Sequence, residues 1–228
     1  MKVHIHRIIR SQRKTCSLEI DLDGNLLVRA PEWASRQEID RIVHRKHSWI
    51  SRKQREAVDR RRKITPRRFV EGEEFLFLGK TYVLKLVDGT GSRGGSGLQL
   101  RNGCFLLSKK YLAEARKTFE NWYRKQARGV LSGRVEHFTS ALGTECPRVK
   151  VTGAMKRWGS CSSKGSLNFT WRLVLAPLHI VDYVVVHEVA HLMVKDHSRF
   201  FWKKVEDVIP DYKQKRKWLK ENGHLLRL

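Results

Sequence analysis

Hydrophobic and polar residues alternate along several segments in the first half of the chain. Residues 3–10 and 18–30 alternate in this way and include Asp23-Gly24-Asn25, a turn signal, so we expect an opening β-hairpin there. The alternation returns over residues 69–87, around a Leu-Gly-Lys turn signal, and residues 98–107 supply one further strand. The N-terminal half is therefore predicted to be rich in strands.

Two other segments have the three- and four-residue spacing of an amphipathic helix. One starts near Ser35 and continues into a cationic segment, residues 52–63, and the other runs from Ser108 to Gly143. We expect one helix from each of them. The glycine-rich residues 88–97 lack the Gly-Lys-Ser/Thr ending of a phosphate-binding loop, so we interpret them as the flexible loop of a hairpin.

The last third of the chain is predicted to combine a small sheet with helices. A strand over residues 148–152 is followed by a hairpin whose second strand is expected at residues 166–175. Pro177 is a favourable first-turn residue for the helix that follows. Two shorter helices, residues 198–209 and 211–219, are then separated by a proline.

Together these elements predict an α+β protein with a strand-rich N-terminal half. We expect two domains: residues 1–108, a strand-rich region with a basic helix, and residues 109–228, which contain most of the helices. The chain has 228 residues, of which 40% are hydrophobic and 31% charged. This composition is too apolar for a disordered tail and too charged for a membrane-spanning protein.

Three features favour a cytoplasmic protein. The longest apolar runs, such as Tyr183–Val186, are far shorter than the roughly 20 residues that a bilayer requires. Residues 1–10 are basic and no apolar run follows them, so no secretory signal is expected. The four cysteines form no CxxC pair, which fits a reducing compartment.

The segment His187-Glu188-Val-Ala-His191 carries the clearest chemical signal. Residues four apart project from the same face of a helix, so the two imidazoles can reach one metal ion. Glu188 can face a ligand of that ion without binding the ion itself, which is the HExxH arrangement of zinc hydrolases. The helix is apolar on nearly all sides and should be buried. Unpaired polar side chains there would cost on the order of 1–3 kcal/mol each, and a metal ion would compensate them.

A catalytic zinc ion has three protein ligands and an open position, and His197 is the nearest candidate for the third ligand. The spacing is that of the metzincins, but Val194 replaces their glycine and no methionine follows Met193 to form their Met-turn, so that subclass is excluded. Asp196 is a candidate either for orienting a ligand or for capping a helix.

Several short motifs along the chain point to one known family. They are His187-Glu-Val-Ala-His191, His197-Ser, Phe201-Trp202, Pro210-Asp-Tyr212, Lys156-Arg-Trp-Gly-Ser-Cys-Ser-Ser163, Asn168, Arg29-Ala-Pro31 and Trp49-Ile50. With these motifs the chain resembles the YgjP-like metallopeptidase family, cytoplasmic relatives of the SprT-like zinc proteases. The resemblance is close from about residue 149 to residue 212 and looser in the N-terminal half. It implies a zincin-like core, with an HExxH helix packed beside a small antiparallel sheet, in which three histidines bind Zn2+ and Glu188 is the catalytic residue.

In such a site zinc lowers the pKa of its bound water to about 7, and Glu188 takes the proton of that water as it attacks a peptide carbonyl. Candidates for stabilising the oxyanion are Tyr183, Tyr212 and the backbone amides of Gly159-Ser160. The substrate is expected to pair with the strand at residues 166–175.

The segment Trp158-Gly-Ser-Cys161 has two interpretations. Cys161 is a candidate nucleophile because histidines exist elsewhere in the chain. Alternatively, the segment is a tight turn that packs Trp158 against the core and places Cys161 near the metal, with Asn168 hydrogen-bonded to the turn.

The formal net charge of +24 and the pI of about 10.4 favour binding to polyanions. Three functions follow from the sequence. The first is a zinc-dependent metallopeptidase acting on a protein or peptide substrate. The second is a nucleic-acid-binding protein with a structural zinc ion, which binds through the basic N-terminal helix. The third is a SprT-like protease that acts on DNA-bound proteins. No membrane partner is expected.

Overall fold

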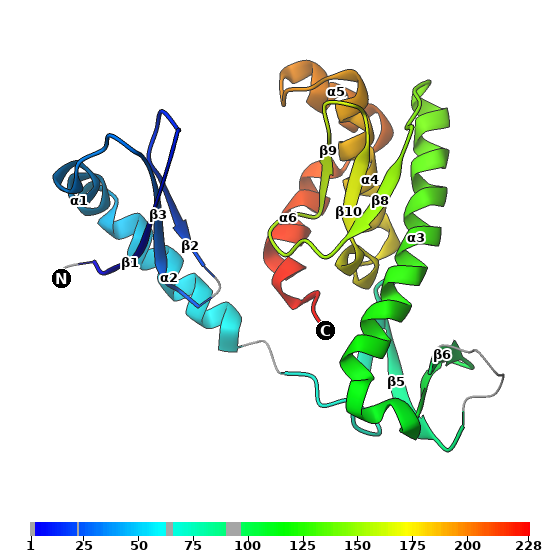
Figure 1. Ribbon diagram of the computed structural model, residues 1–228. Coiled ribbons are helices and arrows are strands. Elements are labelled where there is room, and N and C mark those ends of the chain that lie inside the picture. The colour runs from blue at the N-terminus through cyan, green and yellow to red at the C-terminus, as the bar shows by residue number, and fades with distance from the viewer. Residues whose placement is uncertain (1–2, 22, 63–65, 90–96) are drawn as a thin grey trace. The chain divides into compact units, whose positions relative to one another are not determined.

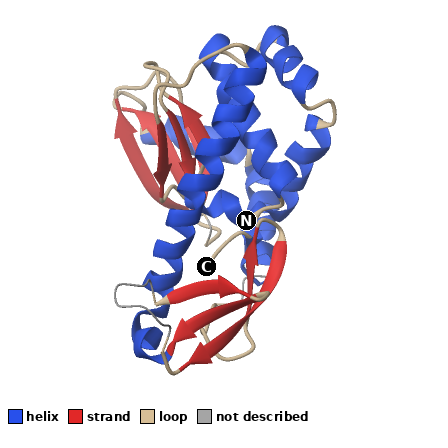
Figure 2. Ribbon diagram, turned by 90° about the vertical axis from the view of Figure 1, so that its right-hand side faces the viewer, coloured by secondary structure: helices blue, strands red, loops and turns tan. Residues whose placement is uncertain are grey.

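The computed structural model describes residues 3–21, 23–62, 66–89 and 97–228. The chain divides into two compact units, Met1–Thr65 and Pro66–Leu228, and each contains both strands and helices (Figure 1; Figure 2). The predicted α+β class is confirmed. The expected boundary between residues 108 and 109 falls inside the second unit. Most of the glycine-rich loop predicted at residues 88–97 lies outside the described residues.

The first unit begins with a three-stranded sheet of order β1-β3-β2, formed by β1 (Ile5–Ser11), β2 (Ser17–Ile20) and β3 (Leu26–Pro31). The predicted hairpin consists of β2 and β3, which are antiparallel. Asp21 holds its turn, because the Asp21 Oδ1 accepts hydrogen bonds from the amides of Asp23 and Asn25, both at 2.9 Å. β1 then lies parallel to β3 on its other side.

Two helices follow, α1 (Arg36–Arg45) and α2 (His47–Arg62), where the sequence predicts one. Ser35 begins α1 with a capping box: its Oγ accepts from the Glu38 amide at 3.2 Å, and Glu38 accepts from the Ser35 amide at 2.8 Å. Lys46 interrupts the helical backbone with φ −99° and ψ 13°. The apolar faces of the helices and the sheet share one core, formed by Leu26, Val28, Ala30, Ala34, Ile39, Val43 and Ile50.

The second unit opens with a four-stranded sheet of order β4-β5-β7-β6. Its strands are β4 (Glu74–Phe77), β5 (Lys80–Val87), β6 (Leu98–Arg101) and β7 (Cys104–Ser108). The turn predicted between β4 and β5 is present, with positive φ at Leu78 and Gly79. The single strand expected over residues 98–107 is instead a hairpin. Asn102 and Gly103 have φ of 50° and 74°, and an Asn-Gly pair favours such a two-residue turn.

A long helix, α3 (Ala115–Leu142), covers this sheet after a 3₁₀ helix (Lys109–Glu114). The helix ends where Gly143 takes the left-handed conformation, φ 61°. Phe119 packs against both Phe75 of β4 and Phe105 of β7, with ring centroids 4.2 and 5.2 Å apart. This shared aromatic core joins residues 66–108 to the rest of the second unit, which is why the predicted boundary lies inside it.

A second sheet has the order β8-β10-β9 and consists of β8 (Val149–Thr152), β9 (Gly159–Cys161) and β10 (Leu167–Thr170). β10 is parallel to β8 and antiparallel to β9, so the sheet is mixed rather than antiparallel as expected. The strand predicted over residues 166–175 ends at Thr170, and Trp171–Leu175 is a 3₁₀ helix. Its run of apolar residues is fully buried, and such a run has no period that separates a strand from a buried turn.

The C-terminal part is helical, as predicted, with α4 (Leu178–Met193), α5 (Arg199–Val208), α6 (Tyr212–Asn222) and a final 3₁₀ helix (Gly223–Leu225). Pro177 is the residue just before α4. α4 lies in the centre of this unit and contacts α3, α5, α6 and β9 (Figure 1). None of the described helices is both long and apolar enough to span a bilayer.

Candidate metal centre and active site

The central helix α4 carries His187, Glu188 and His191 in its last two turns. Its apolar residues are buried on all sides, as the sequence pattern predicts, and the Glu188 side chain is only 6% exposed. After Met193 the chain leaves the helix and turns back, which brings His197 over the same face. Asp196 supports this turn, since its Oδ1 accepts from the Ser198 amide at 3.2 Å immediately before α5. This contact stabilises the turn and is not a helix cap, because the N-cap of α5 is Ser198 and its side chain makes no capping hydrogen bond.

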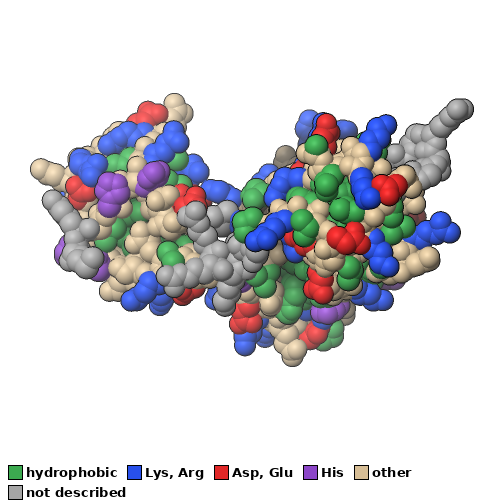
Figure 3. All heavy atoms as spheres, turned by 90° about the horizontal axis from the view of Figure 1, so that it is seen from below, with side chains coloured by type: hydrophobic (Ala, Val, Ile, Leu, Met, Phe, Trp, Pro, Cys, Tyr) green, Lys and Arg blue, Asp and Glu red, His purple; other side chains and the backbone are tan. Residues whose placement is uncertain are grey.

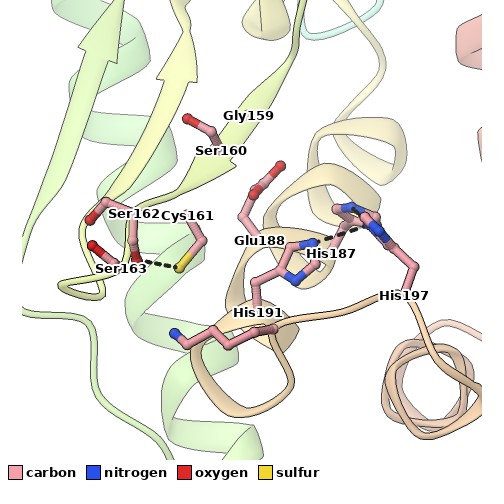
Figure 4. Close-up of a pocket in the computed structure, with 10 residues that line it drawn as sticks. Gly159, Ser160, Cys161, Ser162, Ser163, His187, Glu188, His191 and His197 are labelled. Carbon is pink, nitrogen blue, oxygen red and sulfur yellow. Dashed lines mark hydrogen bonds between the residues drawn. The ribbon is translucent and has the colours of Figure 1, made fainter. Parts of the chain in front are cut away.

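The three histidines converge on one point (Figure 4). The Nε2 of His197 lies 3.1 Å from the Nε2 atoms of both His187 and His191. Imidazole nitrogens about 2.0–2.1 Å from a tetrahedral ion are separated by about 3.3 Å, so the spacing matches one shared metal ion. Among the described residues, the group that could hold an ion here has these three members. Three imidazole nitrogens and an open position form the donor set of a catalytic divalent metal.

The protonation of the rings fits the same interpretation. The Nδ1 of His191 lies 3.0 Å from the carbonyl oxygen of Val194, which can only accept, so Nδ1 carries the proton and Nε2 has a free lone pair. Burial lowers the pKa of His187 to about 3, with further lowering from the charges of His191 and His197. Burial also lowers the pKa of His191. A proton on the Nε2 of His197 can form a hydrogen bond with only one of the two neighbouring Nε2 atoms. A cation at the centre can accept a lone pair from all three Nε2 atoms.

Aromatic side chains of α5 hold the three rings in place. The Phe201 ring is fully buried and lies 4.4 to 4.9 Å, centroid to centroid, from each histidine. Trp202 stacks on His197 at 5.7 Å and on Tyr212 at 5.1 Å. Phe201, Trp202 and Tyr212, which belong to the motifs of the family resemblance, therefore support the three histidines.

Glu188 lies beside β9 and directly opposite Gly159. A Cβ atom at Gly159 would lie 2.6 Å from the Oε1 of Glu188, so only glycine leaves room for the carboxylate. Burial raises the pKa of Glu188 to about 7, while the Arg157 charge and a hydrogen bond from the Cys161 amide act in the opposite direction. Most of the segment that the sequence analysis interprets as a tight turn, Gly159–Cys161, is therefore an edge strand against the carboxylate.

Two cavities meet at Glu188. The larger has a volume of about 370 Å³ and the smaller about 230 Å³, and both are bordered by Gly159, His187 and Glu188. The larger cavity extends along β9 and the loop after it towards His191 and His197 (Figure 4). Lys195 also lines it. The smaller one lies between β9, α4 and α6, and its other lining residues are Trp158, Tyr183, Val184, Arg216 and Leu219. Lys195 and Arg216 were not singled out from the sequence, because nothing in their local pattern marks them.

The remaining candidates from the sequence occupy distinct positions. Tyr183 lines the smaller cavity, and Ser160 lines the larger one with Gly159. Tyr212 is 7% exposed and packs on Trp202 instead. Asn168 donates to the Ser160 carbonyl at 3.3 Å, so it holds β9 as expected.

Cys161 lines the larger cavity but has the environment of an unreactive thiol. Burial raises its pKa, with opposition from the Lys195 charge, and its Sγ donates to the Ser162 carbonyl at 3.4 Å. Because the nucleophilic form of cysteine is the thiolate, a raised pKa disfavours the catalytic-cysteine interpretation.

A comparison with curated proteins gave no match. Among solved structures, the chain is similar to the metallopeptidase zymogen abylysin of Pyrococcus abyssi, with 26% identity and a TM-score of 0.37 over 40% of this chain and 93% of that one. The model of one family, described as YgjP-like, metallopeptidase domain, matches residues 14–222. Because this match spans nearly the whole sequence, the chain belongs to the YgjP-like metallopeptidase family.

Proposed function

We propose that the protein is a zinc-dependent peptidase whose active site is the junction of the two cavities at Glu188. The observation that carries this proposal is the meeting of three imidazole nitrogens, each within hydrogen-bonding distance of another, beside a buried carboxylate at an open cavity. His187, His191 and His197 would hold the ion. Bound zinc supplies Lewis acidity towards water and a substrate carbonyl.

Glu188 acts as the general base in this proposal. It lies beside the ion site because it directly follows His187 on α4, and the Cys161 amide orients it by donating a hydrogen bond. It accepts the proton of the attacking water and passes that proton to the leaving amine. Its position next to His187, with its own side chain directed towards β9, keeps it out of the ligand set.

β9 is the strand that would bind the substrate backbone, in place of the strand expected at residues 166–175. β10 is paired on both sides, whereas β9 has one free edge. The Thr170 amide donates to the Trp158 carbonyl at 2.9 Å, so in the alternating antiparallel pattern the main-chain groups of Gly159 and Cys161 face away from β10. Because the Cys161 amide donates to Glu188, the groups left for a substrate are the amide and carbonyl of Gly159 and the carbonyl of Cys161. A peptide added along this edge passes both cavities and the Glu188 carboxylate.

The test is Glu188→Gln, a change that keeps the size of the side chain and removes its basicity. The variant should retain about one zinc ion per chain by metal analysis, yet lose cleavage of a random-sequence peptide library read by mass spectrometry. Glu221→Gln, at an exposed position on α6, is the matched control. Full cleavage by the Glu188 variant would remove this carboxylate from the mechanism. Loss of zinc from it would indicate that Glu188 supports the metal instead.

We also propose that the first unit binds nucleic acid, because the positive charge of the chain favours binding to polyanions. α1 and α2 expose Arg41, Arg45 and Arg55. Figure 3 shows Lys and Arg spread over the visible face of each unit rather than gathered in one patch, which favours non-specific contact with phosphates. Two of the functions predicted from the sequence also require nucleic acid: a nucleic-acid-binding protein with a structural zinc ion, and a protease acting on DNA-bound proteins.

All four cysteines are free thiols, consistent with the cytoplasmic location proposed from the sequence.

A further inference from the structure

The smaller cavity has the shape of a site for one substrate residue. Its volume of about 230 Å³ is below the roughly 300–1,000 Å³ of sites that enclose a whole small-molecule ligand. Its walls are the apolar and aromatic side chains of Trp158, Tyr183, Val184 and Leu219. Gly159, His187 and Glu188 also line it, so a substrate residue placed in it lies beside the proposed reaction centre.

Arg216 gives this cavity a positive charge. Its guanidinium lies over the Trp202 ring, 5.2 Å from the centroid, and Trp202 also stacks with His197 and with Tyr212. A guanidinium stacked in this way is oriented while its N–H groups remain available as donors. Within the described part of the chain, Arg216 forms no ion pair, unlike its neighbours Lys215 and Lys217.

The charges around the two cavities are unbalanced. Glu188 is the one acidic residue among those that line either cavity, whereas Lys195 lines the larger one and Arg216 the smaller one. The metal ion of the proposed site would add further positive charge. An extended substrate in both cavities would therefore be favoured if it carried negative charge.

We propose that Arg216 binds a carboxylate of the substrate residue that occupies the smaller cavity. This inference rests on the proposed peptidase function and adds its specificity: the residue has an apolar stem, which contacts Trp158 and Leu219, and an acidic end, which pairs with the guanidinium. A planar carboxylate can take two parallel N–H bonds from arginine. The carboxylate has two sources, an acidic side chain or the free C-terminus of the substrate.

Two matched pairs of peptides, built on one parent sequence that the protein cleaves, separate the two sources. In the first pair, a residue next to the scissile bond is either Glu or Gln. In the second pair, the peptide ends at that residue with either a free or an amidated C-terminus. In one of the two pairs, with the carboxylate on one side of the scissile bond, the zinc-loaded full chain should cleave the carboxylate-bearing peptide faster than its uncharged partner. We expect a difference in kcat/KM on the order of 10-fold. Equal rates for both pairs, on both sides of the bond, would overturn the proposal.

Charge reversal assigns the preference to Arg216. Arg216→Glu should lose the preference for a carboxylate and favour Lys at the same position, while Arg216→Lys should retain part of the preference. Lys217→Gln is the matched control, because its side chain is on the same helix but outside the cavity. An unchanged preference in Arg216→Glu would overturn the proposal even with full activity.

A binding measurement keeps this inference separate from the proposed function. The zinc-loaded Glu188→Gln protein is titrated with the same four peptides by calorimetry. Tighter binding of a carboxylate peptide, reduced about 10-fold or more in the double variant with Arg216→Glu, supports the inference whether or not the peptides are cleaved. Equal affinities for all four peptides would overturn it. Absence of cleavage by the unaltered protein would instead count against the peptidase function.

Discussion

Gly159 of β9 and Glu188 of α4 are in such close contact that a single methyl group would not fit between them. A Cβ at position 159 would lie 2.6 Å from both Cγ and Oε1 of Glu188 and 2.8 Å from its Cδ. The strand and the helix can therefore bring their backbones together only because residue 159 has no side chain. This contact connects the free edge of the sheet with the proposed general base.

Gly159→Ala should displace the Glu188 carboxylate and lower kcat by about 100-fold or more, the usual contribution of a positioned general base. Zinc content should remain near one ion per chain, because the atoms nearest to a Cβ at position 159 belong to Glu188 and not to the three histidines. Gly133→Ala is the matched control: its Cβ meets no atom within 4 Å, and the same change in a helix interior should stabilise the protein by roughly 0.5–1 kcal/mol. Full activity of the Gly159 variant would refute the tight fit.

His197→Ala should weaken metal binding more than the roughly 10–100-fold that loss of a partner outside the ligand set costs. The reason is that His197 Nε2 is the nitrogen within 3.1 Å of both other rings. The measurement is zinc content and competition with a chelator. His179→Ala, an exposed histidine on α4, should bind zinc normally. Equal zinc affinity in the two variants would exclude His197 from the ligands.

Metal removal should also lower the melting temperature, because a ligand that binds only the folded state stabilises it. Thermal unfolding with and without a chelator measures this effect in the unaltered protein. The shift should be smaller in His197→Ala, which has less bound metal to lose. A melting temperature insensitive to chelator would argue against a metal held by folded residues.

Phe201→Ala should destabilise the protein by about 3–5 kcal/mol, the usual cost of removing a buried phenylalanine ring. It should also weaken zinc binding, because the Phe201 ring contacts all three histidines. The adjacent Phe200 is 71% exposed, so Phe200→Ala should change neither quantity appreciably. Denaturant unfolding and chelator competition would measure both effects. Phe201→Ala with normal zinc affinity would show that the ring supports the fold but not the site.

Replacing Arg41, Arg45 and Arg55 with Gln should weaken binding of a short duplex DNA to the full chain. Each lost phosphate contact should reduce the slope of log K against log salt by about one. Fluorescence anisotropy over a range of salt concentrations measures the slope. A triple variant on the second unit, with Lys117, Lys203 and Lys217 changed to Gln, controls for net charge, since these exposed lysines each pair with an acid. The same slope in both variants would place any DNA contact elsewhere.

Elements with a long, regular period could be predicted from the sequence. The apolar spacing of residues 108–143 gave α3, and the apolar residues around His187 gave a buried α4, because helical periodicity is a local property. Residues 171–175 were misassigned because a short run of buried residues has no such period. The Asn102-Gly103 turn signal lies inside the single strand that was predicted over residues 98–107, so the hairpin there was missed. The aromatic contacts of Phe75 and Phe119, which join residues 66–108 to α3, link positions far apart in the chain.

By itself, the sequence indicated the candidate chemistry: two histidines with the spacing of one helical face and a glutamate next to the first of them, on a helix too apolar to be exposed. Helix geometry fixes residues four apart, so no other part of the chain was needed for that conclusion. Only the tertiary structure decided that His197 returns to the same point, that β9 rather than β10 has the free edge, and that Gly159 faces Glu188. It also placed Arg216, 28 residues beyond Glu188 in the chain, at a cavity beside that carboxylate. These relationships depend on how separate elements pack, and no local pattern of residues encodes them.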